Sequence, residues 1–333
     1  MRSWILLPLL ALVPISTIAA PALEELPEHL LAVTANPLGN WDIFLVNPDN
    51  GDIKNLTNHK AADSSARWSW DGKQIAFVSD RDGTSNIFTM NFDGTGVKQI
   101  TKEMTNCITL AWSPDGKKIA FMSAKSGLDN IFVVEVATGR ITQLTNEEFA
   151  SRQPAWSPDG KRISYAHYIN GPYEIYAMNA DGTNKVNLSQ GGGLDAAWSP
   201  DGKKIAFTSV RGGGGFRLYT MDGVGGNVKE LSTNDNGVGN VFPVWSPDSK
   251  KIAFTDAVDG NLQVASVGAD GNNYVLLNTK GSSSFPKWAP TGKRVVFARF
   301  EQDQPAAMWI TDPDGQNQRE VLRFYSESAW KPK

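Results

Sequence analysis

Apolar residues along the chain come in short runs rich in β-branched and aromatic side chains, and polar turns interrupt these runs at regular intervals. Runs such as Ile75 to Val78 and Ile119 to Met122 are apolar at every position, a pattern typical of strands with both faces buried. Between residues 153 and 188 the apolar runs and polar turns form one complete unit. This unit predicts four strands: Gln153 to Trp156, Arg162 to His167, Tyr173 to Asn179 and Lys185 to Leu188.

One phrase recurs at the first turn of each such unit. Trp-Ser-Pro-Asp-Gly suits a tight turn, because proline presets φ, aspartate hydrogen-bonds locally and glycine accepts a positive φ. The phrase or a variant of it begins at tryptophans 42 to 47 residues apart: Trp68, Trp112, Trp156, Trp198, Trp245, Trp288 and, in shortened form, Trp330. A period of roughly 40 to 45 residues is the length of one four-stranded propeller blade.

The two ends of the chain determine the predicted number of blades. Leu30 to Ala35, Trp41 to Asn47 and Ile53 to Leu56 match the second, third and fourth strands of a unit, and Ser328 to Trp330 supplies only a first strand. We therefore predict an all-β, seven-bladed β-propeller of four-stranded antiparallel blades, closed by pairing of the N- and C-terminal strands. A six-bladed ring is the alternative. Closure removes open sheet edges.

The N-terminus and the composition indicate where the protein works. Residues 1–22 read as a secretory signal, with Arg2, an apolar core of 14 residues from Ile5 to Ile18 and small residues at the cleavage site. Residues 23–333 then form a single propeller domain that is periplasmic or secreted, without membrane insertion after cleavage, and monomeric. A formal charge of −3 and a pI of about 5.7 give no reason to expect nucleic acid as a partner.

The phrase Trp-Ser-Pro-Asp-Gly-Lys-Lys-Ile-Ala-Phe, followed by Ser-x-Arg-x-Gly, Ile-Phe-x-Met-Asn-x-Asp-Gly and Leu-Thr, resembles the TolB-type β-propeller repeat. Residues 68–101 carry nearly all of it. The resemblance implies a propeller that binds other proteins in the cell envelope, as TolB does in the Tol-Pal system. TolB is six-bladed and preceded by an α/β domain, which we expect to be absent here. Similar propellers occur in oligogalacturonate lyases, which use histidine-rich metal sites, and in prolyl oligopeptidases.

Recognition is expected where the blades differ from one another. The loops between second and third strands vary and share one face with the connections between blades, whereas the short turns repeat. His167 and Tyr168 fall at this variable face. The positions three to five residues before each tryptophan should ring the channel mouth, and they supply the remaining candidate binding residues: Asp63, Ser65, Arg152, Gln153, Asp195, Asn240, Phe242, Phe285 and Glu327.

No pattern in the sequence predicts catalysis, a metal site or a cofactor. The histidines His29, His59 and His167 lie in different units without ligand spacing, and Cys107 reads as a buried, inert thiol. Arg81, Lys125 and Arg211 share one loop position, and we expect each to pair with an acid of a neighbouring blade. We therefore predict a non-enzymatic scaffold that binds a protein or peptide. The alternative is a carbohydrate-active enzyme of the lyase kind or a glycan-binding propeller.

Overall fold

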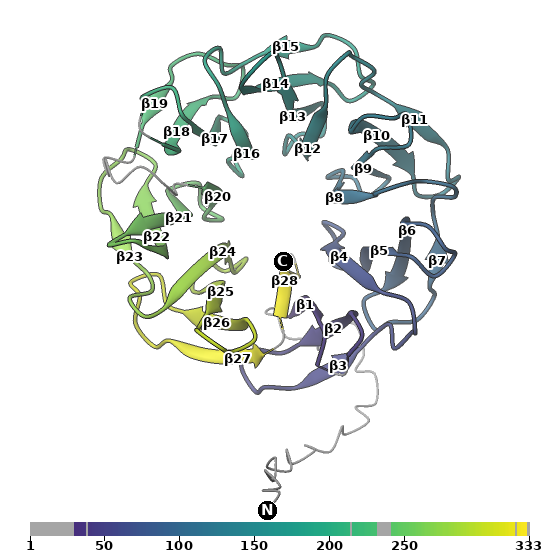
Figure 1. The fold of residues 1–333 in the computed structure, drawn as a ribbon, viewed down its shortest axis with the longest axis horizontal. Coiled ribbons are helices and arrows are strands. Elements are labelled where there is room, and N and C mark those ends of the chain that lie inside the picture. The colour runs from purple at the N-terminus through teal and green to yellow at the C-terminus, as the bar shows by residue number, and fades with distance from the viewer. Residues whose placement is uncertain (1–29, 38, 214, 232–240, 324, 332–333) are drawn as a thin grey trace, which may run out of the picture.

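The computed structural model describes residues 30–37, 39–213, 215–231, 241–323 and 325–331. Their strands form seven four-stranded sheets arranged as blades around one axis (Figure 1). The predicted all-β, seven-bladed propeller is confirmed, and the six-bladed alternative is wrong. The predicted signal, residues 1–22, lies outside the described residues.

In six blades the strands run in sequence order from the axis outward, and in the seventh the last described strand is innermost, followed by the first three. The innermost strands are β4 (Asp63–Trp68), β8 (Ile108–Trp112), β12 (Ser151–Trp156), β16 (Leu194–Trp198), β20 (Val241–Trp245), β24 (Ser282–Trp288) and β28 (Tyr325–Trp330). The second strands are β1 (Leu31–Ala35), β5 (Gln74–Ser79), β9 (Lys118–Ser123), β13 (Arg162–Tyr168), β17 (Lys204–Ser209), β21 (Lys251–Val258) and β25 (Val295–Phe300).

The third strands are β2 (Asp42–Val46), β6 (Asn86–Asn91), β10 (Asn130–Glu135), β14 (Tyr173–Asn179), β18 (Arg217–Asp222), β22 (Asn261–Gly268) and β26 (Ala307–Thr311). The outermost strands are β3 (Ile53–Asn55), β7 (Lys98–Gln99), β11 (Ile141–Gln143), β15 (Val186–Asn187), β19 (Lys229–Glu230), β23 (Val275–Leu276) and β27 (Arg319–Arg323). Most outermost strands have only two or three residues, which limits the exposed sheet edge.

The ring closes in a composite blade made from both ends of the described chain. Strand β28 pairs antiparallel with β1, and Val33 lies opposite Ser328. In Figure 1 the C-terminal strand accordingly lies beside β1 on the axial side of the first blade. The predicted pairing of Ser328 to Trp330 with Leu30 to Ala35 is therefore confirmed.

Five of the repeated tryptophans bond their blade to the one before it: Trp68, Trp112, Trp156, Trp198 and Trp245. The indole N–H of Trp112 donates to the carbonyl oxygen of Arg67 at 3.0 Å, and that of Trp156 donates to Ala111 at 3.1 Å. Each acceptor immediately precedes the tryptophan of the previous blade. The same bond closes the ring, because Trp68 donates to the carbonyl oxygen of Ala329 at 3.0 Å.

The repeated Leu-Thr pair has a structural role as well. The Thr101 hydroxyl accepts a hydrogen bond from the Ile87 amide at 2.9 Å and donates one to the Asn86 side chain at 3.1 Å. Thr145 makes the same two bonds, with Ile131 and Asn130. These bonds tie the connection between two blades to the start of the third strand. The threonine and the asparagine therefore recur together in the two blades.

The core is divided into layers, each shared by neighbouring blades. In one layer Trp112 and Phe121 of one blade pack with Ala76, Val78 and Ile87 of the preceding blade. Each blade is therefore apolar on both faces, as the continuous runs predicted.

The connections define two faces of the ring. We call the end that carries the second-to-third strand loops and the connections between blades the variable face. The opposite end, with the Ser-Pro-Asp-Gly turns, is the turn face. Each turn is held by its own side chains: the Ser157 hydroxyl donates to Asp159 Oδ1 at 2.6 Å, and the Lys161 amide donates to the same oxygen at 3.1 Å.

Candidate functional site

A β-bulge interrupts the innermost strand of six blades at the same place. The pairing of β12 with β13 shifts register between Arg152 and Ala155, and five other blades shift at the equivalent residues, whereas the irregularity in β28 lies one residue earlier, between Tyr325 and Glu327. In these six blades the residue three positions before the tryptophan has a positive φ, from 54° to 58°: Ser65, Thr109, Gln153, Asp195, Phe242 and Phe285. We call these six residues the bulge ring.

The bulge ring places non-glycine residues in a left-handed backbone conformation, which sequence propensity does not favour. Such a φ is unusual for the β-branched Thr109 and for the bulky Phe242 and Phe285. Bulges re-aim side chains and gather beside functional sites. Because the bulge recurs while the side chain changes, the backbone provides one fixed position at which six blades present five kinds of side chain to the axis.

Four consecutive members of the ring contact one another across the blade junctions. The Gln153 amide donates to Asp195 Oδ1 at 2.7 Å, and the Asp195 amide donates back to Gln153 Oε1 at 3.3 Å. The Asp195 carboxylate also accepts a hydrogen bond from the backbone of Phe242. The rings of Phe242 and Phe285 lie 4.7 Å apart, at an interplanar angle of 38°. This arc therefore combines an amide, a carboxyl group and an aromatic pair.

Three of these residues, Gln153, Asp195 and Phe242, line a cavity of about 200 Å³ near the axis. Its walls come from five consecutive innermost strands and include Thr109, Gln153, Asp195, Phe242 and Lys287. The Thr109 hydroxyl oxygen is buried and has no hydrogen-bond partner within the described residues. Ligand pockets usually have about 300 to 1,000 Å³, so the cavity suits one inserted side chain better than a larger organic molecule.

The electrostatic character of the cavity is set by Asp195. Burial raises the pKa of its carboxyl group above the ordinary value. Hydrogen bonds from Gln153, the Phe242 backbone and Thr208, together with the charge of Lys287, lower this pKa and only partly offset the burial. The site consequently favours the neutral carboxyl group more than water does.

Three further predicted residues lie together at the edge of the variable face, apart from the cavity. Arg152 forms an ion pair with Asp129 at 2.5 Å, and its guanidinium lies 5.8 Å from the Tyr173 ring centroid. Tyr168 packs edge-on against Tyr173 at 5.4 Å. The buried His167 lies with Nδ1 3.0 Å from the Ser151 hydroxyl. Ser151 has no exposed surface, so a substrate does not reach this serine–histidine pair.

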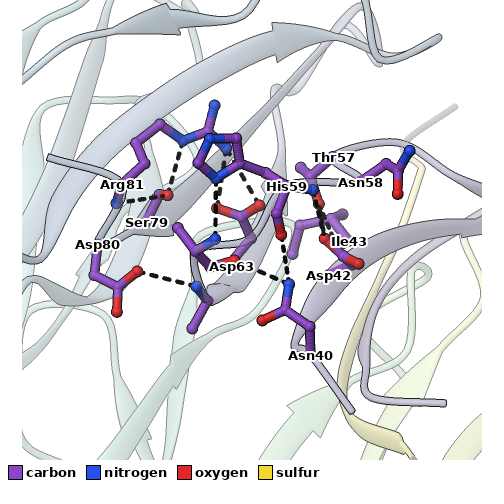
Figure 2. A network of polar contacts seen from close by, with 12 residues as sticks. Asn40, Asp42, Ile43, Thr57, Asn58, His59, Asp63, Ser79, Asp80 and Arg81 are labelled. Carbon is purple, nitrogen blue, oxygen red and sulfur yellow. Dashed lines mark hydrogen bonds and ion pairs between the residues drawn. The ribbon is translucent and has the colours of Figure 1, made fainter. Parts of the chain in front are cut away.

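Asp63 is placed in a polar network at the junction of the first two blades, and Figure 2 shows it beneath Arg81. Its carboxylate is fully buried and ion-paired with Arg81 at 3.0 Å. The acid belongs to the same blade as Arg81, so the expected pairing with a neighbouring blade is wrong for this residue. Arg211 binds the carbonyl oxygens of Ser189 and Gly192 in place of an acid.

The same network takes up the polar groups of the adjoining connection. Asp42 accepts hydrogen bonds from Thr57 at 3.0 Å and from the His59 amide at 3.3 Å, and His59 Nδ1 accepts one from the Ala61 amide at 3.0 Å (Figure 2). His59 and its surroundings thus hold the connection in place.

The last two predicted residues are only partly defined. Asn240 lies outside the described residues. Glu327 is in β28, opposite Thr34. Sequence reasoning named positions three to five residues before each tryptophan, of which Gln153, Asp195 and Phe242 line the cavity, but it did not name Lys287. Strand alternation could not have identified it, because the bulge between Ser284 and Lys287 interrupts the alternation at this place.

Exposed apolar side chains occur at both ends of the ring. Of the fifteen large hydrophobic residues that are exposed in the described chain, eight lie at or beside the variable face: Trp41, Ile108, Leu128, Val210, Phe216, Leu262, Phe285 and Phe300. Five lie in turns of the turn face, Trp70, Val97, Val224, Val228 and Tyr274, and Ile53 and Val186 begin outermost strands. The variable face thus has somewhat more apolar surface available for contact with a partner.

Other candidate chemistry has local explanations. Cys107 is fully buried, and burial raises the pKa of its thiol to about 12. No three His, Cys, Asp or Glu side chains of the described residues are grouped so that they could hold a metal ion. In the same part of the chain, no helix has the length and hydropathy needed to cross a membrane.

Comparison with known proteins places the sequence among propellers of one kind. The family model described as the TolB β-propeller domain matches residues 17–107 and 91–333. No individually curated protein matches the sequence.

Solved structures show the same architecture. TolB from Acinetobacter baumannii is 23% identical, covers 96% of this chain over 89% of its own, and has a TM-score of 0.61. An oligogalacturonate lyase from Vibrio parahaemolyticus is 15% identical, with coverages of 86% and 92% and a TM-score of 0.68. The propeller domain of the Trilobed protease from Pyrococcus furiosus, described as having an open velcro topology, is 15% identical, with coverages of 90% and 96% and a TM-score of 0.67. At these identities the similarities show the fold alone.

Proposed function

Because this chain belongs to the TolB β-propeller family, we propose that it is an exported, non-enzymatic scaffold that binds a protein or peptide at its variable face and channel. Export is inferred from the signal-like residues 1–22. The observation that supports the binding proposal is the bulge ring, where one repeated backbone feature presents five kinds of side chain from six blades.

The partner contacts two connected surfaces in this proposal. The exposed apolar residues of the variable face, among them Trp41, Phe216 and Phe300, provide a broad contact area. The cavity bounded by Asp195 and Phe242 receives one side chain of the partner. At protein interfaces a few residues in a central pocket usually supply most of the binding free energy, and the wider area around them excludes water.

Site-specific crosslinking in the producing cell tests this function. A photoreactive phenylalanine analogue is placed at Phe216 or Phe300 on the variable face, and at Val224, an exposed residue of the turn face, as the matched control. We expect one defined protein adduct from the first two positions and none from Val224. An adduct formed only at Val224 would place the interface on the opposite face.

The alternative, a carbohydrate-active or glycan-binding propeller, gives a different result in the same experiment. Variable-face positions would then yield no protein adduct, and the purified protein would bind or cleave acidic oligosaccharides. Substitution of Asp195 by Asn would abolish that activity. The lyase similarity shows the fold, and no contact of the described site favours this alternative over the scaffold.

A further inference from the structure

The turn face has a hollow between the blade of β20 to β23 and the blade of β24 to β27, which the proposed function does not use. A cavity of about 490 Å³ lies between the first turns of these blades and is lined by Lys251, Trp288 and Thr291, among others. A neighbouring cavity of about 570 Å³ shares Lys251 and adds Lys293 and Arg294. The two cavities therefore adjoin along Lys251.

Trp288 departs from the other tryptophans at this junction. The indole N–H of Trp245 donates to the carbonyl oxygen of Ala197 at 3.0 Å. Trp198 reaches the Ser164 hydroxyl at 3.0 Å instead of a carbonyl. Trp288 is 8% exposed, and its indole N–H has no hydrogen-bond partner within the described residues. A buried donor without a partner costs free energy unless a ligand or water satisfies it.

The turn that follows Trp288 has no aspartate. The other five turns of this type contain aspartate, whereas this one reads Ala289-Pro290-Thr291-Gly292. The Ser–Asp hydrogen bond of the other turns is consequently missing. The backbone bonds of the turn remain, but its one side-chain contact within the described residues is a long one of 3.3 Å, from the Lys293 amide to the Thr291 hydroxyl. This junction carries one carboxylate fewer than its equivalents.

The acids that remain around the two cavities keep their charge, but each is oriented by a hydrogen bond from a neutral group close to it in the sequence. Asp248 accepts hydrogen bonds from the Ser246 hydroxyl at 2.7 Å and from the Lys250 amide at 3.1 Å. Asp312 accepts the Asn317 amide at 2.6 Å, and Asp314 accepts the Gln316 amide at 3.0 Å.

The basic side chains around the two cavities have fewer close partners. Lys251 and Lys293 have no ion pair within the described residues, and Arg294 approaches Asp49 only to 3.8 Å. At the equivalent place in another blade, Lys203 lies 3.8 Å from Asp201 of its own turn. Lys293 lacks such a partner because Thr291 stands where that aspartate would be.

We propose that this junction binds an anionic oxygen group, a carboxylate or a phosphate, through the indole N–H of Trp288 and the ammonium groups of Lys251 and Lys293. The buried donor supplies direction and the two lysines supply charge, a combination that suits a charged acceptor. Thr291 leaves the position open that an aspartate would otherwise occupy.

The experiment follows the indole N–H resonances of the protein labelled with ¹⁵N-tryptophan, with Trp288→Phe used to assign one signal. Sodium acetate and sodium phosphate are titrated separately, and sodium chloride at equal ionic strength is the control. We expect a saturable shift of the Trp288 resonance, whereas the Trp245 resonance stays in place because its N–H is already bonded.

Two variants and one matched control make the test specific. Lys293→Ala should weaken binding by roughly tenfold, because it removes one charged contact. Lys203→Ala, the equivalent change in another blade, should leave binding unchanged. Ala289→Ser combined with Thr291→Asp restores the common turn and should abolish the shift without unfolding the protein.

A short glutamate peptide distinguishes the two sources of such an anion. Tighter binding of the peptide than of acetate indicates an acidic chain, and equal binding indicates a free small anion. The proposal is overturned if Trp288 shows no saturable shift, if sodium chloride shifts it equally, or if the variant with the restored Ser–Asp turn binds as tightly as the original protein.

Discussion

The ring of Phe242 lies 4.7 Å from the ring of Phe285, although the two residues belong to different blades and each has a positive φ. The contact continues the arc that begins with Gln153 and Asp195. Blade junctions in this propeller are therefore joined near the axis by side chains that differ from one junction to the next, in addition to the repeated tryptophan bonds.

The aromatic pair should dominate partner binding. Phe242→Ala and Phe285→Ala should each weaken the crosslinked partner's affinity by about 1 to 3 kcal/mol, since buried aromatic anchors carry most interface energy. Calorimetric titration measures the loss, and circular dichroism checks the fold. Val224→Ala on the turn face is the control; equal weakening by that variant would contradict the assignment of the face.

The left-handed backbone of the bulge ring predicts an unusual stabilising change. Thr109→Gly should raise the free energy of unfolding by about 1 kcal/mol, because glycine adopts this φ without the strain of a β-branched side chain. Thr109→Ala retains most of the strain and should not stabilise. Urea unfolding measures both. A destabilised glycine variant would show that the Thr109 side chain contributes more than its backbone costs.

Asp195 should make stability fall as pH rises. Burial raises the pKa of its carboxyl group in the folded state, so between the unfolded and folded pKa values the folded protein binds more protons than the unfolded one. Its contribution is most favourable below that window and is lost above it. Asp195→Asn should therefore gain stability relative to the original protein as the pH increases, measured by urea unfolding at several pH values.

Asp115 provides a control of opposite sign. The hydrogen bond from Ser113 holds the pKa of Asp115 below its ordinary value, so its stabilising contribution is present above the unfolded pKa and lost as the pH falls through the folded one. Asp115→Asn should be destabilised at neutral pH and approach the original protein in acid. If the stabilities of the Asp195→Asn and Asp115→Asn variants, relative to the original protein, changed with pH in the same direction, the opposite pKa shifts of the two carboxyl groups would be contradicted.

Ring closure should depend on the Trp68 indole. Trp68→Phe removes its hydrogen bond to the carbonyl oxygen of Ala329 and should lower the free energy of unfolding by about 1 kcal/mol more than Trp288→Phe does. Trp288 is the matched control, because its indole N–H has no partner within the described residues. Equal losses would show that packing alone decides both.

Cys107 should resist thiol reagents in the folded protein. Burial raises the pKa of its thiol to about 12, so the reactive thiolate is scarce near neutral pH. Labelling with a chromogenic disulfide reagent should proceed only after denaturant is added. Rapid labelling of the native protein would contradict the buried placement.

The repeat in the sequence predicted most of the fold. The predicted strand Tyr173 to Asn179 coincides with β14, and the strand fragments at the two ends of the sequence correctly predicted the composite blade. This succeeded because turns and apolar runs have local causes. The bulge ring could not be predicted from local preference, since Thr109 and Phe285 occupy a φ that glycine or asparagine would ordinarily mark.

The candidate site was predicted by position and not by contact. The spacing before each tryptophan identified Gln153, Asp195, Phe242 and Phe285, but their mutual contacts depend on how neighbouring blades align. Asp63 came from the same spacing and is instead ion-paired with Arg81 and fully buried. That arginine is 18 residues away, in a loop whose course the pattern does not specify.

The tryptophan bonds give the ring a direction of assembly. Trp112, Trp156 and Trp245 each donate to a carbonyl that precedes them in the chain, so a polypeptide made from its N-terminus finds each acceptor already synthesised. Trp68 differs from these three donors, because its acceptor Ala329 is synthesised 261 residues after it. Until Ala329 and its strand have been made, the Trp68 bond cannot form, and the blades already folded remain an open arc.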